Sequence, residues 1–147
     1  MLEIVSTAAE FQAVKDPWNA LADEMRNPLL RHEFHAACFQ TYDDVYQLAV
    51  FVVRRNGAVT ALAPLHLARY AGVRRLETMG RRIGEPSGFL ARDGHSLRAL
   101  FSGLAKHGLP MLLSRLESGS LEAGLLQEPL GGRPFGHVAS AGAFARV

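Results

Sequence analysis

Two β-rich segments joined by Asn56-Gly57 constrain the fold of this chain more than any other feature. Residues 46–55 and 58–68 are rich in apolar and β-branched side chains, and Asn-Gly is a preferred two-residue turn of a β-hairpin. Both faces of the first segment are apolar, which predicts a central strand covered on both sides. Pro64 has no N–H for the ladder, so it predicts a bulge or an edge in the second segment. The sequence therefore predicts a sheet built around a central hairpin.

Helix signals stand on both sides of this hairpin. Thr7 and Glu10 have the spacing of a capping box, and Asp16-Pro17 is typical of a helix start with Asp16 as the N-cap. Ser96 is expected to cap a later helix. The pattern predicts, in chain order, strand 3–6, helix 7–15, a helix from 16, helix 31–41, the hairpin, strands 74–79 and 88–91, a helix from 96, strand 111–116, helix 121–127 and a strand at 137–140. We expect one α/β (α+β) domain over 1–147, with a mixed, mostly antiparallel sheet and helices on both faces.

Composition is that of a globular protein. The 147 residues are 48% hydrophobic and 20% charged, which suits one ordinary domain with a proper core. No apolar run approaches the roughly 18 residues that span a bilayer, and the N-terminus has no secretory pattern. A single cysteine, Cys38, excludes an internal disulfide and fits a reducing compartment. We therefore expect no membrane span and a cytoplasmic location.

Charge is uneven along the chain. From Arg69 to Arg92 the sequence has only two acidic residues, Glu77 and Glu85, and six arginines. The arginines are Arg69, Arg74, Arg75, Arg81, Arg82 and Arg92. Such a strip either attracts an anionic partner or forms solvated strand ends and turns. Nucleic-acid readers interleave aromatic and basic residues, and this strip holds only Tyr70 and Phe89. No nucleic-acid partner is expected.

Several familiar motifs are absent or incomplete. In HEFHAAC the second histidine comes one residue too early for a zincin, although His32, His35 and Cys38 fall on one broad side of a helix. A buried cysteine mostly behaves as a small hydrophobe, so we expect no metal. Gly84-Glu-Pro-Ser87-Gly88 has the wrong spacing for a nucleophile elbow, and neither a P-loop nor a GxGxxG motif occurs.

Beyond these patterns, the sequence resembles a known family. The segments PWNALADEMRNPLLRHEFHAACF, LAVFVVRRNGAVTALAPLHLAR, VRRLETMGRRIGEPSGFLAR and LRALFSGLAKHG are similar to those of the GNAT N-acyltransferase superfamily. They resemble in particular the N-terminal half of tandem-GNAT, cellulose-biosynthesis-type acetyltransferases, which are related to the Fem-type transferases. The resemblance covers about residues 17–127 and implies a GNAT-like fold.

The resemblance also implies a site for acetyl-CoA or another acyl-CoA. GNAT enzymes hold the pyrophosphate of that donor on backbone N–H groups where a Gly-containing turn enters a helix. The matching residues here are Arg92, Gly94, His95, Ser96 and Leu97. Asp93 places a negative charge where the phosphate would lie.

For the chemistry, the resemblance implies attack of an amine or hydroxyl on the acyl carbonyl, with a general base that takes the proton. Glu85 and His66 are the candidate bases. The alternatives are that Glu85 is a turn residue paired with Arg81 or Arg82, and that His66 is a solvated strand residue. Arg81, Arg82 and Ser87 are the candidates for substrate binding.

The sequence thus favours an acyltransferase, with a small-molecule acceptor and with a second GNAT-like domain or a homodimer partner. One alternative is a non-catalytic GNAT-like domain that packs against a catalytic one. Another is a small sensor or scaffold α/β domain whose 46–67 hairpin binds a protein. Burial of that hairpin by the domain's own helices would argue against this last function.

Overall fold

The computed structural model describes residues 1–42, 44–81, 88–114, 116 and 119–127. The first half of the chain forms β1 (Leu2–Val5), α1 (Ala8–Ala13), α2 (Lys15–Glu24), a 3-10 turn (Pro28–Leu30), α3 (His32–Thr41), β2 (Gln47–Leu48), β3 (Val50–Arg55) and β4 (Ala58–Ala63). The second half forms β5 (Leu65–Tyr70), β6 (Val73–Thr78), β7 (Leu90–Ala91), α4 (Gly94–His107), β8 (Met111–Leu112) and α5 (Leu121–Gln127).

The strands form two four-stranded sheets. One long, bent hairpin contributes β3 and β4 to the first sheet and β2 and β5 to the second. One sheet has the order β1-β3-β4-β7 and the other the order β2-β5-β6-β8. In the described part of the chain β6 and β8 run parallel and the other pairs antiparallel. The chain passes from β4 to β5 at Pro64, whose carbonyl accepts a hydrogen bond from the Met79 N–H at 2.9 Å. Pro64 therefore marks the corner at which the chain leaves one sheet for the other.

The β3–β4 hairpin has the turn that its sequence predicts. Asn56 and Gly57 have φ angles of 52° and 80°, and a type I′ turn requires positive φ at both positions. Strand β3 lies between β1 and β4, and residues 50–53 are buried. The prediction of a central, doubly covered strand is confirmed.

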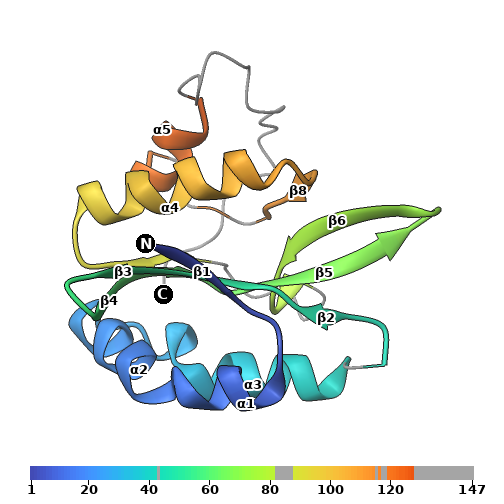
Figure 1. Ribbon diagram of the computed structural model, residues 1–147, viewed down its shortest axis with the longest axis horizontal. Helices are drawn as coiled ribbons and strands as arrows, with labels where there is room; N and C mark the ends of the chain where they lie inside the picture. Colours follow the sequence, from blue (N-terminus) through green and yellow to red (C-terminus); the bar gives the residue numbers. More distant parts are fainter. Residues whose placement is uncertain (43, 82–87, 115, 117–118, 128–147) are drawn as a thin grey trace.

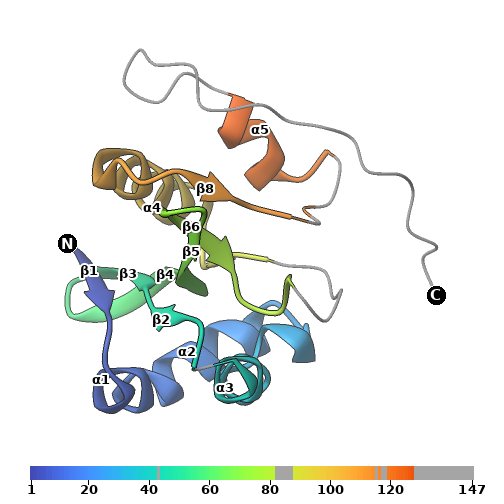
Figure 2. The ribbon, with the colours of Figure 1, turned by 90° about the vertical axis from the view of Figure 1, so that its right-hand side faces the viewer.

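Helices cover both faces of the β1-β3-β4-β7 sheet. On one face α1, α2 and α3 pack through a cluster that includes Trp18, Leu21 and Val52. On the other face α4 and α5 pack through a cluster that includes Phe51, Leu100 and Phe101. Figures 1 and 2 show these two helical layers from perpendicular directions, with the sheet between them. The predicted fold class, a mixed and mostly antiparallel sheet with a central hairpin and helices on both faces, is confirmed.

The starts of the helices agree with the sequence in part. Thr7 and Glu10 form the predicted capping box at α1. Asp16 is not a cap, because α2 begins at Lys15 directly after α1 and Val14 is its N-cap. Ser96 is not a cap either, because the Asp93 side chain caps α4 by accepting a hydrogen bond from the Ser96 N–H at 2.7 Å. The strand predicted at 137–140 lies outside the described residues.

Candidate functional site

The turn into α4, where the sequence predicts the acyl-donor site, is held by internal contacts. Strand β7 leads into this turn, and the Arg92 N–H donates to the Thr60 carbonyl at 2.9 Å. The Arg92 guanidinium pairs with Glu24 of α2, with Nη2–Oε1 and Nε–Oε2 distances of 3.0 and 3.3 Å. The arginine that the resemblance assigns to the donor is thus bound to a carboxylate of the chain itself.

The N-terminus of α4 also already holds an anion. The Asp93 carboxylate accepts from the Ser96 N–H, and this backbone hydrogen bond, followed by one with the Ser96 side chain, lowers the pKa of Asp93. Ser96 and Leu97 are buried, His95 is exposed and Gly94 lies under Leu121 of α5. A helix N-terminus attracts negative charge through its free N–H groups. The turn therefore fits a pyrophosphate only if Asp93 gives up its cap.

A second place with buried charge lies where the sheet bends. Glu77 of β6 has a side chain that is 3% exposed, and it stands opposite His66 of β5 in the register of the two strands. Glu77 Oε1 accepts from Arg75 Nε at 2.6 Å, and Oε2 lies 3.5 Å from Arg81 Nη1 and 3.7 Å from His66 Nε2. The two guanidinium groups balance the carboxylate charge, and the imidazole lies on its remaining side.

The His66 ring completes this place and faces a narrow hollow. Its ring stacks on that of Tyr46 with 3.8 Å between the centroids, and the residue is 6% exposed. The interpretation of His66 as a solvated strand residue is therefore wrong. The hollow is lined by Cys38, Phe39, Tyr42, Tyr46, His66, Met79, Gly80 and Arg81. Its volume of about 10 Å³ is that of a single water. The cluster places a buried imidazole ring beside water-sized space.

The structure brings some of the predicted site residues together and leaves others apart. His66 and Arg81 meet through Glu77, while Arg92, Gly94, His95, Ser96 and Leu97 form the separate turn into α4. Glu85, Arg82 and Ser87 lie outside the described residues. Glu77, Arg75 and Tyr46 are residues of the cluster that the sequence analysis did not select as site residues. Glu77 could have been found by pairing strands 65–70 and 73–78 across Ala71-Gly72, because this register sets it opposite His66.

The histidines of HEFHAAC hydrogen-bond to backbone carbonyls, His32 to one of α1 and His35 to the N-cap residue of its own helix. His32 Nε2 lies 3.0 Å from the Phe11 carbonyl and His35 Nδ1 lies 3.0 Å from the Arg31 carbonyl, so each ring nitrogen must carry the proton and donate. Burial lowers the pKa of both rings, that of His35 to about 4. Among the described residues, no three His, Cys, Asp or Glu side chains are grouped so that they could hold a metal ion.

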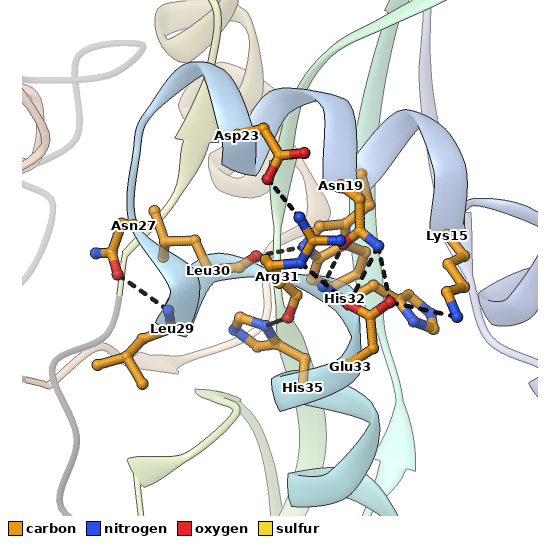
Figure 3. Close-up of polar contacts among 11 residues, drawn as sticks. Lys15, Asn19, Asp23, Asn27, Leu29, Leu30, Arg31, His32, Glu33 and His35 are labelled. Atoms are coloured by element: carbon orange, nitrogen blue, oxygen red, sulfur yellow. Dashed lines mark hydrogen bonds and ion pairs between the residues drawn. The ribbon is translucent and has the colours of Figure 1, made fainter.

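Polar side chains around these histidines hold α2 and α3 together (Figure 3). Asn19 accepts from the His32 N–H at 2.8 Å and donates to Glu33, and Arg31 pairs with Asp23. Lys15 lies 3.3 Å from Glu33, whose pKa falls to about 2, chiefly through a hydrogen bond with its own backbone N–H. This network holds α2 and α3 in place. Helix α3 contributes Cys38 to the lining of the hollow.

Comparison with known proteins shows the fold alone. No family model matches the chain, and no curated protein matches it. The crystal structure of TTHA1254 from Thermus thermophilus aligns over 98% of both chains with a TM-score of 0.54 at 13% identity. A point mutant of that protein aligns over the same shares with a TM-score of 0.53 at 12% identity. These two likenesses show a common fold.

A third solved structure is more distant. It is a GNAT family acetyltransferase from Staphylococcus aureus, aligned over 99% of this chain and 96% of that one at 11% identity. Its TM-score is 0.48. Within the described residues, no helix has the length and apolarity needed to cross a membrane.

Proposed function

We propose that this chain is a GNAT-type acyltransferase domain, which transfers an acyl group from a CoA thioester to a small amine or hydroxyl acceptor. The sequence resemblance supports this function, and so does the observed order of strands and helices, which is the order that the resemblance implies. The observation that carries the proposal is the buried Glu77–His66 pair beside the hollow at the bend of the sheet. A cytoplasmic location, where acyl-CoA is made and used, remains part of the proposal.

In such a transfer the acceptor must lose a proton as its nitrogen or oxygen attacks the acyl carbonyl. The carbon–sulfur bond then breaks, and CoA leaves as a thiolate that takes up a proton to give the free thiol. His66 is the proposed proton acceptor, because Glu77 already binds two guanidinium groups and the imidazole faces the hollow. Glu77 positions the ring, with its Oε2 3.7 Å from His66 Nε2. Glu85 remains the other candidate base. Arg81, together with Arg82 and Ser87, is proposed to bind the acceptor.

The donor is proposed to bind at the turn into α4, on Arg92, Gly94, His95, Ser96 and Leu97. For this the Asp93 carboxylate must leave the helix N-terminus and Arg92 must leave Glu24, since both now occupy the positions of a phosphate and its counter-charge. Affinity for the donor should therefore be limited by these internal contacts.

Calorimetric titration with acetyl-CoA tests the donor site. Asp93→Ser keeps a helix cap but removes the negative charge, so binding should strengthen by several-fold in this variant. Arg92→Ala should weaken it, and Glu24→Gln, which frees Arg92, should not. Absence of heat at millimolar ligand in the wild type and in Asp93→Ser would exclude acyl transfer by this chain alone.

The second candidate function is a non-catalytic GNAT-like domain that packs against a catalytic partner domain. The internal capping of α4 by Asp93 and the Arg92–Glu24 pair favour it, because they fill the place of the donor. The third candidate, a scaffold that binds a protein through the 46–67 hairpin, loses support. The domain's own helices bury most of that hairpin.

A further inference from the structure

The outer part of the β5–β6 hairpin projects from the body of the protein. We call residues 68–75 the outer arm. Strand β2 pairs only with Leu67 and His66, and β8 pairs only with Leu76 and Glu77, so within the described residues the outer arm is a two-stranded ribbon with both edges open. Figure 1 shows β5 and β6 extending past both helical layers. A two-stranded ribbon by itself is at best marginally stable in water, so contact with a partner would stabilise this arm.

The outer arm carries two arginines that oppose each other. Arg69 and Arg74 are directly paired in the register, and both are exposed. Like charges placed opposite each other on one face of a ribbon repel. Neither forms an ion pair with a described residue, whereas Arg75, Arg81 and Arg92 of the same basic strip each bind a glutamate. An added carboxylate between Arg69 and Arg74 would relieve this repulsion.

Apolar surface accompanies these charges. Val45, which is 52% exposed, lines the same hollow as Arg69 and Arg74. Tyr70 and Val73 face each other at the tip and are 68% and 56% exposed, but they lie on the opposite face of the ribbon from the two arginines. Between the arm and residues 44–47 lies a hollow of about 420 Å³. It is lined by Asp44, Val45, Tyr46, Gln47, Leu67, Ala68, Arg69 and Arg74. The surface thus offers an open strand edge, a positive pair and, at Val45, an apolar contact at one place.

We propose that the outer arm and this hollow are the docking surface for a protein partner that contributes an extended segment with a carboxylate and an apolar side chain. The carboxylate binds between Arg69 and Arg74, the backbone of the segment pairs with the open edge of β5, and the apolar side chain fills the hollow beside Val45. Two arginines facing Asp44 are too few for a nucleic acid, which needs several phosphate contacts. Apart from Tyr46, which lines both hollows, this proposal involves other residues than the proposed function, and it is independent of it.

Selection from a displayed library of short random peptides tests the proposal. Peptides enriched on the whole wild-type chain should combine Asp or Glu with apolar residues in alternation. The double variant Arg69→Glu/Arg74→Glu should bind them about tenfold or more weakly. The matched variant Arg26→Glu/Arg55→Glu changes two exposed arginines elsewhere and should bind them as the wild type does. Binding should also slow hydrogen exchange in residues 68–75.

Four outcomes would overturn the proposal. The first is that the enriched peptides have no acidic residues, and the second is that the two double variants lose equal affinity. The third is that the chain forms a dimer that dissociates in the Arg69→Glu/Arg74→Glu variant. The fourth is that a duplex oligonucleotide binds the arm more strongly than the peptides do. Circular dichroism of both double variants establishes that each is folded before binding is compared.

Discussion

The inner and outer halves of the β5–β6 hairpin belong to the same two strands, but charged side chains are buried and paired in the inner half and exposed in the outer half. In the inner half, Glu77 is buried and surrounded by Arg75, Arg81 and His66. In the outer half, Arg69 and Arg74 stand opposite each other in solvent and form no ion pair with a described residue, although Asp44 lines the same hollow. The difference follows from the neighbours, since β2 and β8 flank the inner half and end before the outer one.

This contrast shows what a basic strip in a sequence can become. Where flanking strands exclude water, charges must be paired, because an isolated buried charge is costly. Where the flanking strands end, water screens the charges and their partners can be supplied from outside. The inner half is therefore suited to chemistry and the outer half to docking.

The largest expected effect is that of breaking the buried cluster. Glu77→Gln keeps the shape of the side chain but leaves three positively charged or polar partners without their carboxylate, so the free energy of unfolding should fall by about 3 kcal/mol. Urea unfolding measures this change. The matched control is Glu24→Gln, which breaks the half-exposed Arg92–Glu24 pair and should cost below about 1 kcal/mol. Equal costs for the two variants would contradict the buried role of Glu77.

The next effect concerns His35, a buried histidine whose pKa no carboxylate of the described residues raises. Burial lowers the pKa of His35 to about 4, whereas an unfolded histidine titrates near 6.5. Between these values the unfolded chain binds more protons than the folded one, so the free energy of unfolding must rise with pH and fall on acidification. The loss from pH 6.5 to pH 4 is on the order of 3 kcal/mol.

Urea unfolding between pH 7.5 and pH 4 measures this dependence on pH. His35→Gln retains an N–H donor for the Arg31 carbonyl but does not titrate, so its stability should depend less on pH in this window. The lowered pKa of His32 acts in the same direction and leaves a residual slope. An unchanged slope in His35→Gln would show that other groups cause the acid sensitivity.

The sequence predicted most of the fold because its signals were local. Asn56-Gly57 fixed the turn of the central hairpin, and the Thr7–Glu10 capping box fixed the start of α1. The errors at Asp16 and Ser96 both arise because the helix begins earlier in the chain than the predicted cap. Helix α1 leads directly into α2, so Asp16 lies inside the helix and is not its N-cap. Asp93 comes earlier in the chain than Ser96 and caps α4 in its place.

The candidate site was less predictable, because it depends on pairing across strands. His66 was selected as a polar residue of the hairpin, but its burial follows from Tyr46 stacking on its ring. Glu77 counted only as one acid within a basic strip until the register placed it opposite His66. Side chains that meet across a sheet are adjacent in space and not in sequence, so periodicity alone did not reveal the cluster.

The smallest expected effect is a gain in stability from a substitution in the outer half of the hairpin, whereas the first is a loss from a substitution in the inner half. Replacing Arg74 by threonine removes one of two opposed like charges and adds a good strand former, so the chain should gain about 0.2–0.5 kcal/mol. The gain should shrink when salt rises from about 0.01 M to about 1 M, because the repulsion is exposed and screened. A double-mutant cycle with Arg69→Thr isolates the repulsive term, since the double variant should gain less than the sum of the single ones. Additive gains, or a loss from Arg74→Thr, would mean that the two arginines do not repel, and the contrast between the halves of the hairpin would then rest on burial alone.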